Sequence, residues 1–276
     1  MGRHWKKFPQ ETISLLFTAV EEDDVVEPDV CFPEQLDLRC SDEKIHDNYA
    51  LCLQFWDEGF TREELLGLIE DFQRNEDLPE SVRMRYKFIR ARYKHLRFAQ
   101  RLYGKKHTCY WLFHSTTVAL GHFQDAFRNG NKKNLRFYGN RLRLLLSTPV
   151  WTWVYNAVHK ITLETEGGFI TYRQKQIREL QQMIATPEIT GLQFHDVRKI
   201  VSQQVSFYDT LRSINPNDQE AYKVSRFLSA INGLMGDRHD EMVADKLAGG
   251  TLYDDQTPLD DDIRQRLEAL VAHYPL

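Results

Sequence analysis

The chain has 276 residues, of which 42% are hydrophobic and 28% are charged, with a formal net charge of −4 at pH 7. This length can bury a core without disulfide bonds, and no apolar run approaches the roughly 20 residues that cross a bilayer. Residues 1–10 lead into no apolar signal segment, so we expect a cytoplasmic protein that does not enter a membrane.

The charges are separated along the chain. Residues 1–80 carry 21 Asp/Glu against 7 Lys/Arg, whereas residues 81–146 carry 16 Lys/Arg and a single acid, Asp125. This separation predicts an acidic and partly irregular region 1–80, a basic helical domain 81–250, and an acidic tail 251–276 with a short helix. A basic block of this kind indicates a polyanionic partner, or an acidic part of the same chain that covers it.

In chain order, the first predicted feature is an irregular connection over residues 21–43, which is acidic and contains Pro28 and Pro33. We call it the acidic segment, and its carboxylates are candidates for covering the basic block. Apolar periodicity and turn signals then predict a series of helices. Their ranges are 47–56, 61–75, 81–103, 110–128, 133–146, 151–164, 172–184, 194–214, 219–235, 239–247 and 259–272. No region has several strands of period two, so the predicted fold class is all-α.

The helix over 81–103 carries an apolar stripe beside a row of cations. The stripe recurs at three- and four-residue steps, as a buried helix face does, at Val82, Tyr86, Ile89, Tyr93, Leu96 and Tyr103. The adjacent row, which we call the basic ridge, consists of Arg83, Lys87, Arg90, Lys94, Arg97 and Arg101. Exposed helices usually interleave acids at this spacing, and this helix has none. The ridge therefore requires an acidic segment or an anion against it.

Two later motifs resemble a known family. One predicted helix begins with His195-Asp196-Val197-Arg198, and a later stretch reads Leu234-Met235-Gly236-Asp237-Arg238-His239-Asp240. These resemble the second half of the CHAD domain, a helical domain named for a histidine, in which a His-x-x-Arg helix precedes a Leu-Gly-x-x-His-Asp ending. In the first half, Arg136, Arg141 and Arg143 fall where that family has arginines, and Lys133 falls where it has a histidine. The resemblance covers roughly residues 111–250.

This resemblance implies two related antiparallel helical bundles with an N-terminal helical extension. It also implies a basic channel between the bundles that binds inorganic polyphosphate, without catalysis and without a cofactor. The first expected contacts are Arg136, Arg141, Arg143, His195 and Arg198, followed by Lys133, Lys199, Arg90, Lys94 and Arg97. Independently, a chain of phosphates suits repeated cationic contacts with guanidinium forks on paired oxygens, and histidines would add pH sensitivity near neutrality.

Two other functions remain open. The basic helices could bind single-stranded RNA or another nucleic acid, with stacking platforms at Tyr86, Tyr93, Tyr103, Tyr110 and Trp111, although most of these tyrosines fall on the apolar stripe. His195, His239 and Asp240 could hold a metal for phosphoester hydrolysis. Neighbouring helical residues point about 100° apart, however, so such a site needs further ligands. We expect no resident metal, and expect His239 and Asp240 to cap the helix 239–247.

No motif predicts a bound cofactor. The sequence contains no nucleophile elbow, Walker loop or dinucleotide-binding loop. Its cysteines are spaced too irregularly for a metal clip or a compact disulfide framework, so we expect free thiols at Cys31, Cys40, Cys52 and Cys109.

Overall fold

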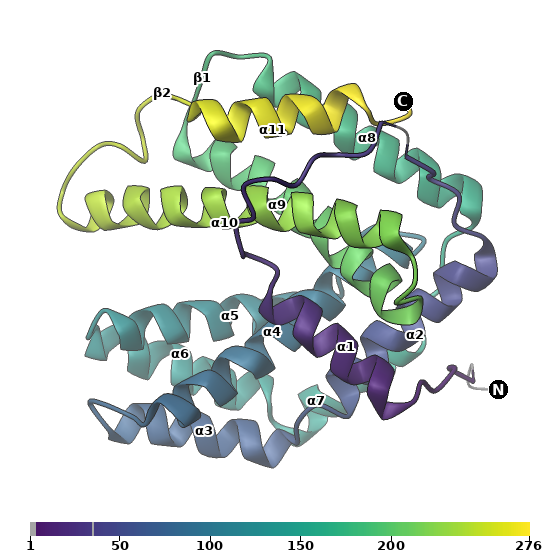
Figure 1. The fold of residues 1–276 in the computed structure, drawn as a ribbon. Helices are drawn as coiled ribbons and strands as arrows, with labels where there is room; N and C mark the ends of the chain where they lie inside the picture. Colours follow the sequence, from purple (N-terminus) through teal and green to yellow (C-terminus); the bar gives the residue numbers. More distant parts are fainter. Residues whose placement is uncertain (1–3, 35) are drawn as a thin grey trace. The chain divides into compact units, whose positions relative to one another are not determined.

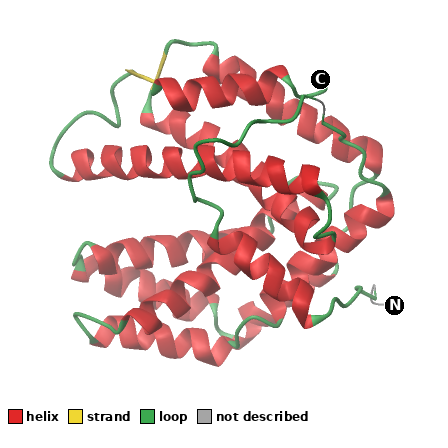
Figure 2. Ribbon diagram, in the orientation of Figure 1, coloured by secondary structure: helices red, strands yellow, loops and turns green. Residues whose placement is uncertain are grey.

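The computed structural model describes residues 4–34 and 36–276, apart from the side chain of Leu247. Across these residues the protein is all-α, as predicted, with eleven helices that hold 71% of the described residues and one pair of two-residue strands (Figure 2). None of the described helices combines the length and the hydropathy that a membrane crossing requires. The four cysteines are free thiols.

Contacts between residues divide the described chain into two compact units. Unit 1 comprises residues 4–8 and Ile45–Glu164, and unit 2 comprises residues 9–34, 36–44 and Thr165–Leu276. Unit 2 thus joins an early segment to the last part of the chain. The regions predicted from charge, 1–80, 81–250 and 251–276, follow composition along the sequence, and as domains they stay a prediction.

Unit 1 holds most of α2 (Asp42–Asp57), and with it α3 (Arg62–Arg74), α4 (Glu80–Tyr103), α5 (Trp111–Arg128), α6 (Lys132–Leu145) and α7 (Thr148–His159). Helix α5 packs against α4, α6 and α7, and α3 packs against α4 and α6 (Figure 1). Helix α3 begins at its predicted start because Thr61 and Glu64 form a capping box. Aromatic rings fill the core, where the ring centroid of Trp56 lies 5.8 Å from that of Tyr93 and 5.6 Å from that of Phe113.

Unit 2 contains α1 (Gln10–Glu21), α8 (Glu166–Ile184), α9 (Gly191–Ile214), α10 (Gln219–Leu247) and α11 (Asp261–Ala272). Helix α9 lies at its centre and packs against α1, α8 and α10, while α11 packs against α8 and α10 (Figure 1). The strands β1 (Glu188–Ile189) and β2 (Thr257–Pro258) pair antiparallel, with Ile189 opposite Thr257. This pair joins the chain before α9 to the chain before α11.

In three places the helices of the structure differ from the prediction. Helix α1 was not predicted; it starts directly after Pro9 and buries Ile13, Leu16 and Ala19. Helix α10 runs unbroken through Gly236, because one glycine costs a helix only about 1 kcal/mol relative to alanine and Met235 and Met242 are buried on either side. Residues 167–168, predicted as a break, form the first turn of α8, which Thr165 caps.

Glycines 67 and 233 give opposite expected results when replaced by alanine. Gly67 lies exposed inside α3 with no atom near its missing side chain, so Gly67→Ala should stabilise the protein by about 1 kcal/mol. At Gly233 in α10, a Cβ atom would stand 2.1 Å from the carbonyl oxygen of Asp24, so Gly233→Ala should cost about 1–3 kcal/mol. Denaturant unfolding of both variants measures this, and an unaffected Gly233→Ala would contradict the packing of the acidic segment on α10.

Candidate anion-binding surface

Helix α4 presents the basic ridge because its apolar stripe is buried in unit 1. Five of the six predicted stripe residues are at most 1% exposed: Tyr86, Ile89, Tyr93, Leu96 and Tyr103. Val82 is half-buried. The Tyr86 hydroxyl donates a hydrogen bond of 3.0 Å to the carbonyl oxygen of Leu120 in α5. The predicted orientation of the helix is therefore confirmed, and the cations lie beside the buried face.

Three cations of the ridge, Arg83, Arg90 and Lys94, have partners within unit 1. Arg83 forms an ion pair of 3.3 Å with Asp77. Arg90 donates to the amide oxygen of Gln124 in α5 at 2.9 Å. The ammonium group of Lys94 lies 6.0 Å from the ring centroid of Phe98. Of these three contacts, only the ion pair of Arg83 with Asp77 brings a negatively charged group to the ridge.

Arg97 and Arg101 lie one helical turn apart and have no carboxylate partner among the described residues. The Nε atoms of both are buried without a hydrogen-bond partner. Burial, and after it the neighbouring charge of Arg101, lowers the pKa of Arg97 to about 10. Arg97 is still charged at neutral pH, but its side chain is half-buried and lies beside a like charge. This pair of guanidinium groups is the strongest candidate in unit 1 for an anion contact.

Helix α6 contains no acidic residue and exposes its cations. Lys132 pairs with Glu76 of the preceding loop. Arg143 donates to the side-chain oxygen of Asn140 at 3.3 Å, which leaves its charge without a counter-charge among the described residues. The other predicted contacts of this helix are exposed and have no ion pair or hydrogen bond with a described side chain: Lys133, Arg136 and Arg141.

Aromatic residues are divided between the core and the surface. The predicted stacking residues Tyr86, Tyr93 and Tyr103 are buried, so their rings cannot stack on bases. Trp111, at the start of α5, is 65% exposed, and Phe137 of α6 is 57% exposed. Trp153 and Tyr155 of α7 are 61% and 37% exposed, so the described surface of unit 1 offers several aromatic rings as well as cations.

In unit 2, residues from both motifs of the resemblance come together. The ring centroids of His195 in α9 and His239 in α10 lie 5.5 Å apart. A Cβ atom at Gly236 would stand 3.0 Å from the guanidinium group of Arg198, so the glycine leaves room for that side chain. Burial, and then the charge of Lys199, lowers the pKa of His195 to about 4. His195 is thus uncharged at neutral pH, and the pH sensitivity expected of histidines near neutrality does not apply to it.

The remaining predicted site residues of unit 2 are less available. Lys199 forms an ion pair of 2.8 Å with Asp196. His239 and Asp240 lie inside α10, so the prediction that they cap a helix is wrong, because the chain does not break at Gly236. Within the part of the chain that the structure describes, no group of three or more His, Cys, Asp or Glu is placed to hold a metal ion.

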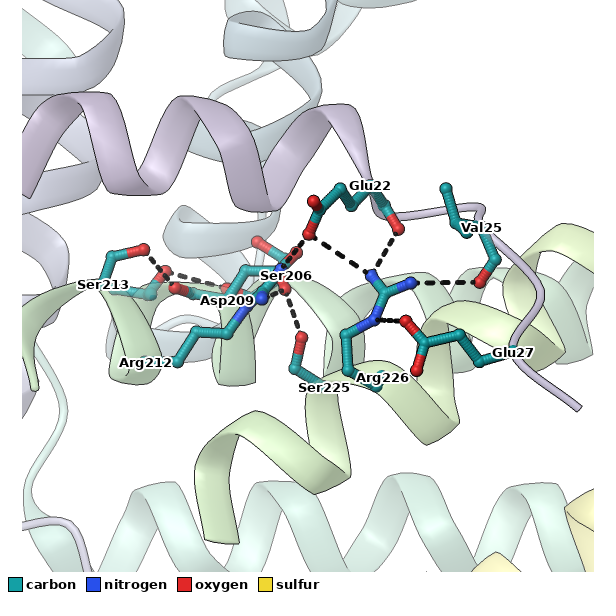
Figure 3. A network of polar contacts seen from close by, with 10 residues as sticks. Glu22, Val25, Glu27, Ser206, Asp209, Arg212, Ser213, Ser225 and Arg226 are labelled. Atoms are coloured by element: carbon teal, nitrogen blue, oxygen red, sulfur yellow. Dashed lines mark hydrogen bonds and ion pairs between the residues drawn. The ribbon is translucent and has the colours of Figure 1, made fainter. Parts of the chain in front are cut away.

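The acidic segment uses its carboxylates within unit 2. The carboxylate of Glu22 lies 3.5 Å from Arg212 and 3.6 Å from Arg226, and Glu27 accepts a hydrogen bond of 2.7 Å from Arg226 (Figure 3). Beside them, Asp209 of α9 is buried and lies 3.4 Å from Arg212. Glu22 and Glu27 are therefore already paired within unit 2, and the hypothesis that the acidic segment covers the basic block stays a prediction. Periodicity could not have found these partners, because they are about 200 positions apart in the sequence.

The predicted contacts thus fall in both units. Unit 1 holds Lys133, Arg136, Arg141, Arg143, Arg90, Lys94 and Arg97, and unit 2 holds His195, Arg198 and Lys199. Compared with models of protein families, with curated proteins and with solved structures, the chain matches none.

Proposed function

We propose that this protein binds a polyanion without catalysing a reaction, and that the ligand is inorganic polyphosphate. The observation that carries the proposal is the end of the basic ridge, where Arg97 and Arg101 place two guanidinium groups side by side with no carboxylate partner among the described residues. Like charges left together in this way cost stability, and an anion removes that cost.

A linear chain of phosphates fits this surface better than a single phosphate ion. From Arg83 to Arg101 the ridge extends roughly 27 Å along α4, at 1.5 Å per residue. Cations repeat along the whole of this length, and α6 adds further arginines in the same unit. Repeated guanidinium and ammonium groups favour a ligand whose negative charges also repeat, because each contact is charge-assisted and requires little directional precision.

The resemblance to the CHAD family supports the same ligand and extends the proposal to unit 2. In this proposal the two units are the related bundles, and His195 and Arg198 add contacts to those of unit 1. Its support is that His195 lies against His239, and Arg198 against Gly236, within unit 2. The shared channel implied by the resemblance stays a prediction.

Single-stranded RNA is the second candidate. The exposed rings of Phe137 and Trp111 favour it, since bases can stack on such rings beside cations that contact the phosphates. Inorganic polyphosphate has no base and gains nothing from these rings. Both ligands would therefore use the cations of unit 1, and only RNA would also use these rings.

A competition experiment separates the two candidates. Labelled long-chain polyphosphate bound to the protein is displaced by unlabelled polyphosphate or by single-stranded RNA of equal phosphate concentration, at fixed salt. We expect polyphosphate to compete at least about ten-fold better. Equal or better competition by RNA, together with a loss of RNA binding in Phe137→Ala, would transfer the proposal to RNA.

Variants in each unit then locate the ligand. Arg136→Gln with Arg141→Gln tests unit 1, and Arg198→Gln tests unit 2. Arg178→Gln is the matched control, because Arg178 is exposed on α8 and lies outside the proposed contacts. We expect weaker polyphosphate binding in both test variants and unchanged binding in the control. Equal, small losses of polyphosphate binding in both test variants and in the control would indicate that overall charge alone attracts the ligand.

A further inference from the structure

Arg173 is a fully buried cation in the core of unit 2. It lies on α8 at 0% exposure, and its Nε and Nη2 atoms donate to the amide oxygen of Gln204 at 3.3 and 2.8 Å. Its Nη2 atom also donates to the hydroxyl of Tyr208 at 3.2 Å. Four aromatic rings surround the guanidinium carbon at centroid distances of 4.1–5.5 Å: Phe169, Phe207, Tyr208 and Tyr274.

No group of the described chain balances this charge. Arg173 forms no ion pair with a described carboxylate. The nearby groups that could become negative are Cys40, Tyr208 and Tyr274, and burial raises the pKa of each, that of Cys40 to about 11. All three are therefore neutral at pH 7.

Two hydrogen-bond donors in this core have no acceptor among the described residues. They are the Nη1 atom of Arg173 and the hydroxyl of Tyr274, which are both buried. Aromatic faces attract a cation but do not accept the hydrogen bonds of its N–H groups in full. An unsatisfied buried donor is costly, and an unbalanced buried charge is more costly still. A single anion with one negative charge would accept a hydrogen bond from each of the two donors and would balance the charge of Arg173.

We propose that unit 2 binds one small monovalent anion, of the size of chloride, between the Nη1 atom of Arg173 and the hydroxyl of Tyr274. One charge is sufficient because there is one unbalanced cation. A polyphosphate chain does not fit this position, because the side chains around it are buried on all sides. The site is therefore independent of the polyanion surface, and its role is to complete the core that holds α8 against α9 and the last residues of the chain.

Unfolding at matched ionic strength tests this proposal. The full chain is unfolded by denaturant in potassium chloride and in potassium gluconate, whose anion is too large for the site. For one site, each ten-fold rise in chloride above its dissociation constant lowers the unfolding equilibrium constant about ten-fold. Gluconate should produce no such change. Equal unfolding constants in the two salts at every concentration would overturn the proposal.

Tyr274→Phe is the decisive variant, because it removes one hydroxyl and keeps the ring against Arg173. We expect it to fold and to need about ten-fold more chloride for the same stabilisation. The double variant of Arg136→Gln and Arg141→Gln should respond to chloride like the natural chain, which excludes adsorption on the surface of unit 1. An unchanged chloride response in Tyr274→Phe, or a lost response in the surface variant, would contradict the assignment.

Discussion

Replacing Arg97 and Arg101 together by glutamine should weaken polyphosphate binding about 100-fold without destabilising the fold. A charge-assisted hydrogen bond contributes about 1.5–3 kcal/mol, which is about ten-fold or more in affinity for each arginine. Neither arginine has a carboxylate partner among the described residues, and burial and Arg101 already lower the pKa of Arg97. Removal of both charges therefore ends a repulsion, and the free energy of unfolding should stay equal or rise. Titration with polyphosphate and denaturant unfolding measure the two effects.

Arg83→Gln is the matched control on the same helix. Arg83 is exposed and paired with Asp77 at 3.3 Å, so its charge is already balanced and its loss should weaken binding less than about three-fold. A double variant of Arg97 and Arg101 that binds like this control would show that the pair does not contact the ligand. A double variant that unfolds early would show instead that these arginines hold the structure together.

Asp209→Asn should make the protein more stable above neutral pH and leave it unchanged near pH 4. Asp209 is buried, and this burial raises its pKa from 3.8 to about 7 although Arg212 and Ser225 oppose the shift. Below about pH 4 the carboxyl group is protonated in both the folded and the unfolded chain. Between pH 4 and 7 only the unfolded chain releases the proton, so the free energy of unfolding falls as the pH rises.

The size of this effect follows from the rise of the pKa of Asp209 from 3.8 to about 7. At 1.36 kcal/mol per pKa unit, the charged carboxylate lowers the free energy of unfolding of the natural protein by at most about 4 kcal/mol above pH 7. Asparagine keeps the shape of the side chain and carries no charge, so Asp209→Asn should recover most of this difference at pH 8. In the natural chain Arg212 also contacts Glu22 at 3.5 Å (Figure 3), and we expect this contact to remain in the variant.

Unfolding curves from pH 4 to 8 test this prediction. Asp196→Asn serves as the control, because Asp196 lies on the same helix with its side chain 49% exposed and pairs with Lys199. That variant should keep the slope of the natural protein, whereas Asp209→Asn should flatten it. A loss of stability at pH 8 in Asp209→Asn would mean that the ion pair with Arg212 outweighs the cost of burying the charge.

Periodicity predicted those features of the fold that depend on neighbouring turns. The stripe from Tyr86 to Tyr103 identified the buried face of α4, and the same spacing located the cations beside it. Helix α10 was divided wrongly at Gly236, since the burial of Met235 and Met242 outweighs the low helix propensity of one glycine. Tertiary packing keeps α10 continuous through Gly236, and the local sequence does not predict that packing.

Partners from distant segments could not be predicted. Arg226 binds Glu22 and Glu27 although nothing near it in the sequence indicates an acidic partner. Arg173 left a signal that sequence reasoning missed. It shares the helical spacing of the buried residues Phe169, Ile177 and Leu180, so its position on α8 belongs to the core face. A cation in register with apolar residues indicates either a buried partner or a bound anion.

The sharpest test of polyphosphate binding is the structure of the protein in complex with a short polyphosphate. We expect phosphoryl oxygens within hydrogen-bond distance of the guanidinium groups of Arg97 and Arg101, with further oxygens near the arginines of α6. A ligand bound elsewhere, with Arg97 and Arg101 left without phosphate or paired with carboxylates of the chain itself, would contradict it.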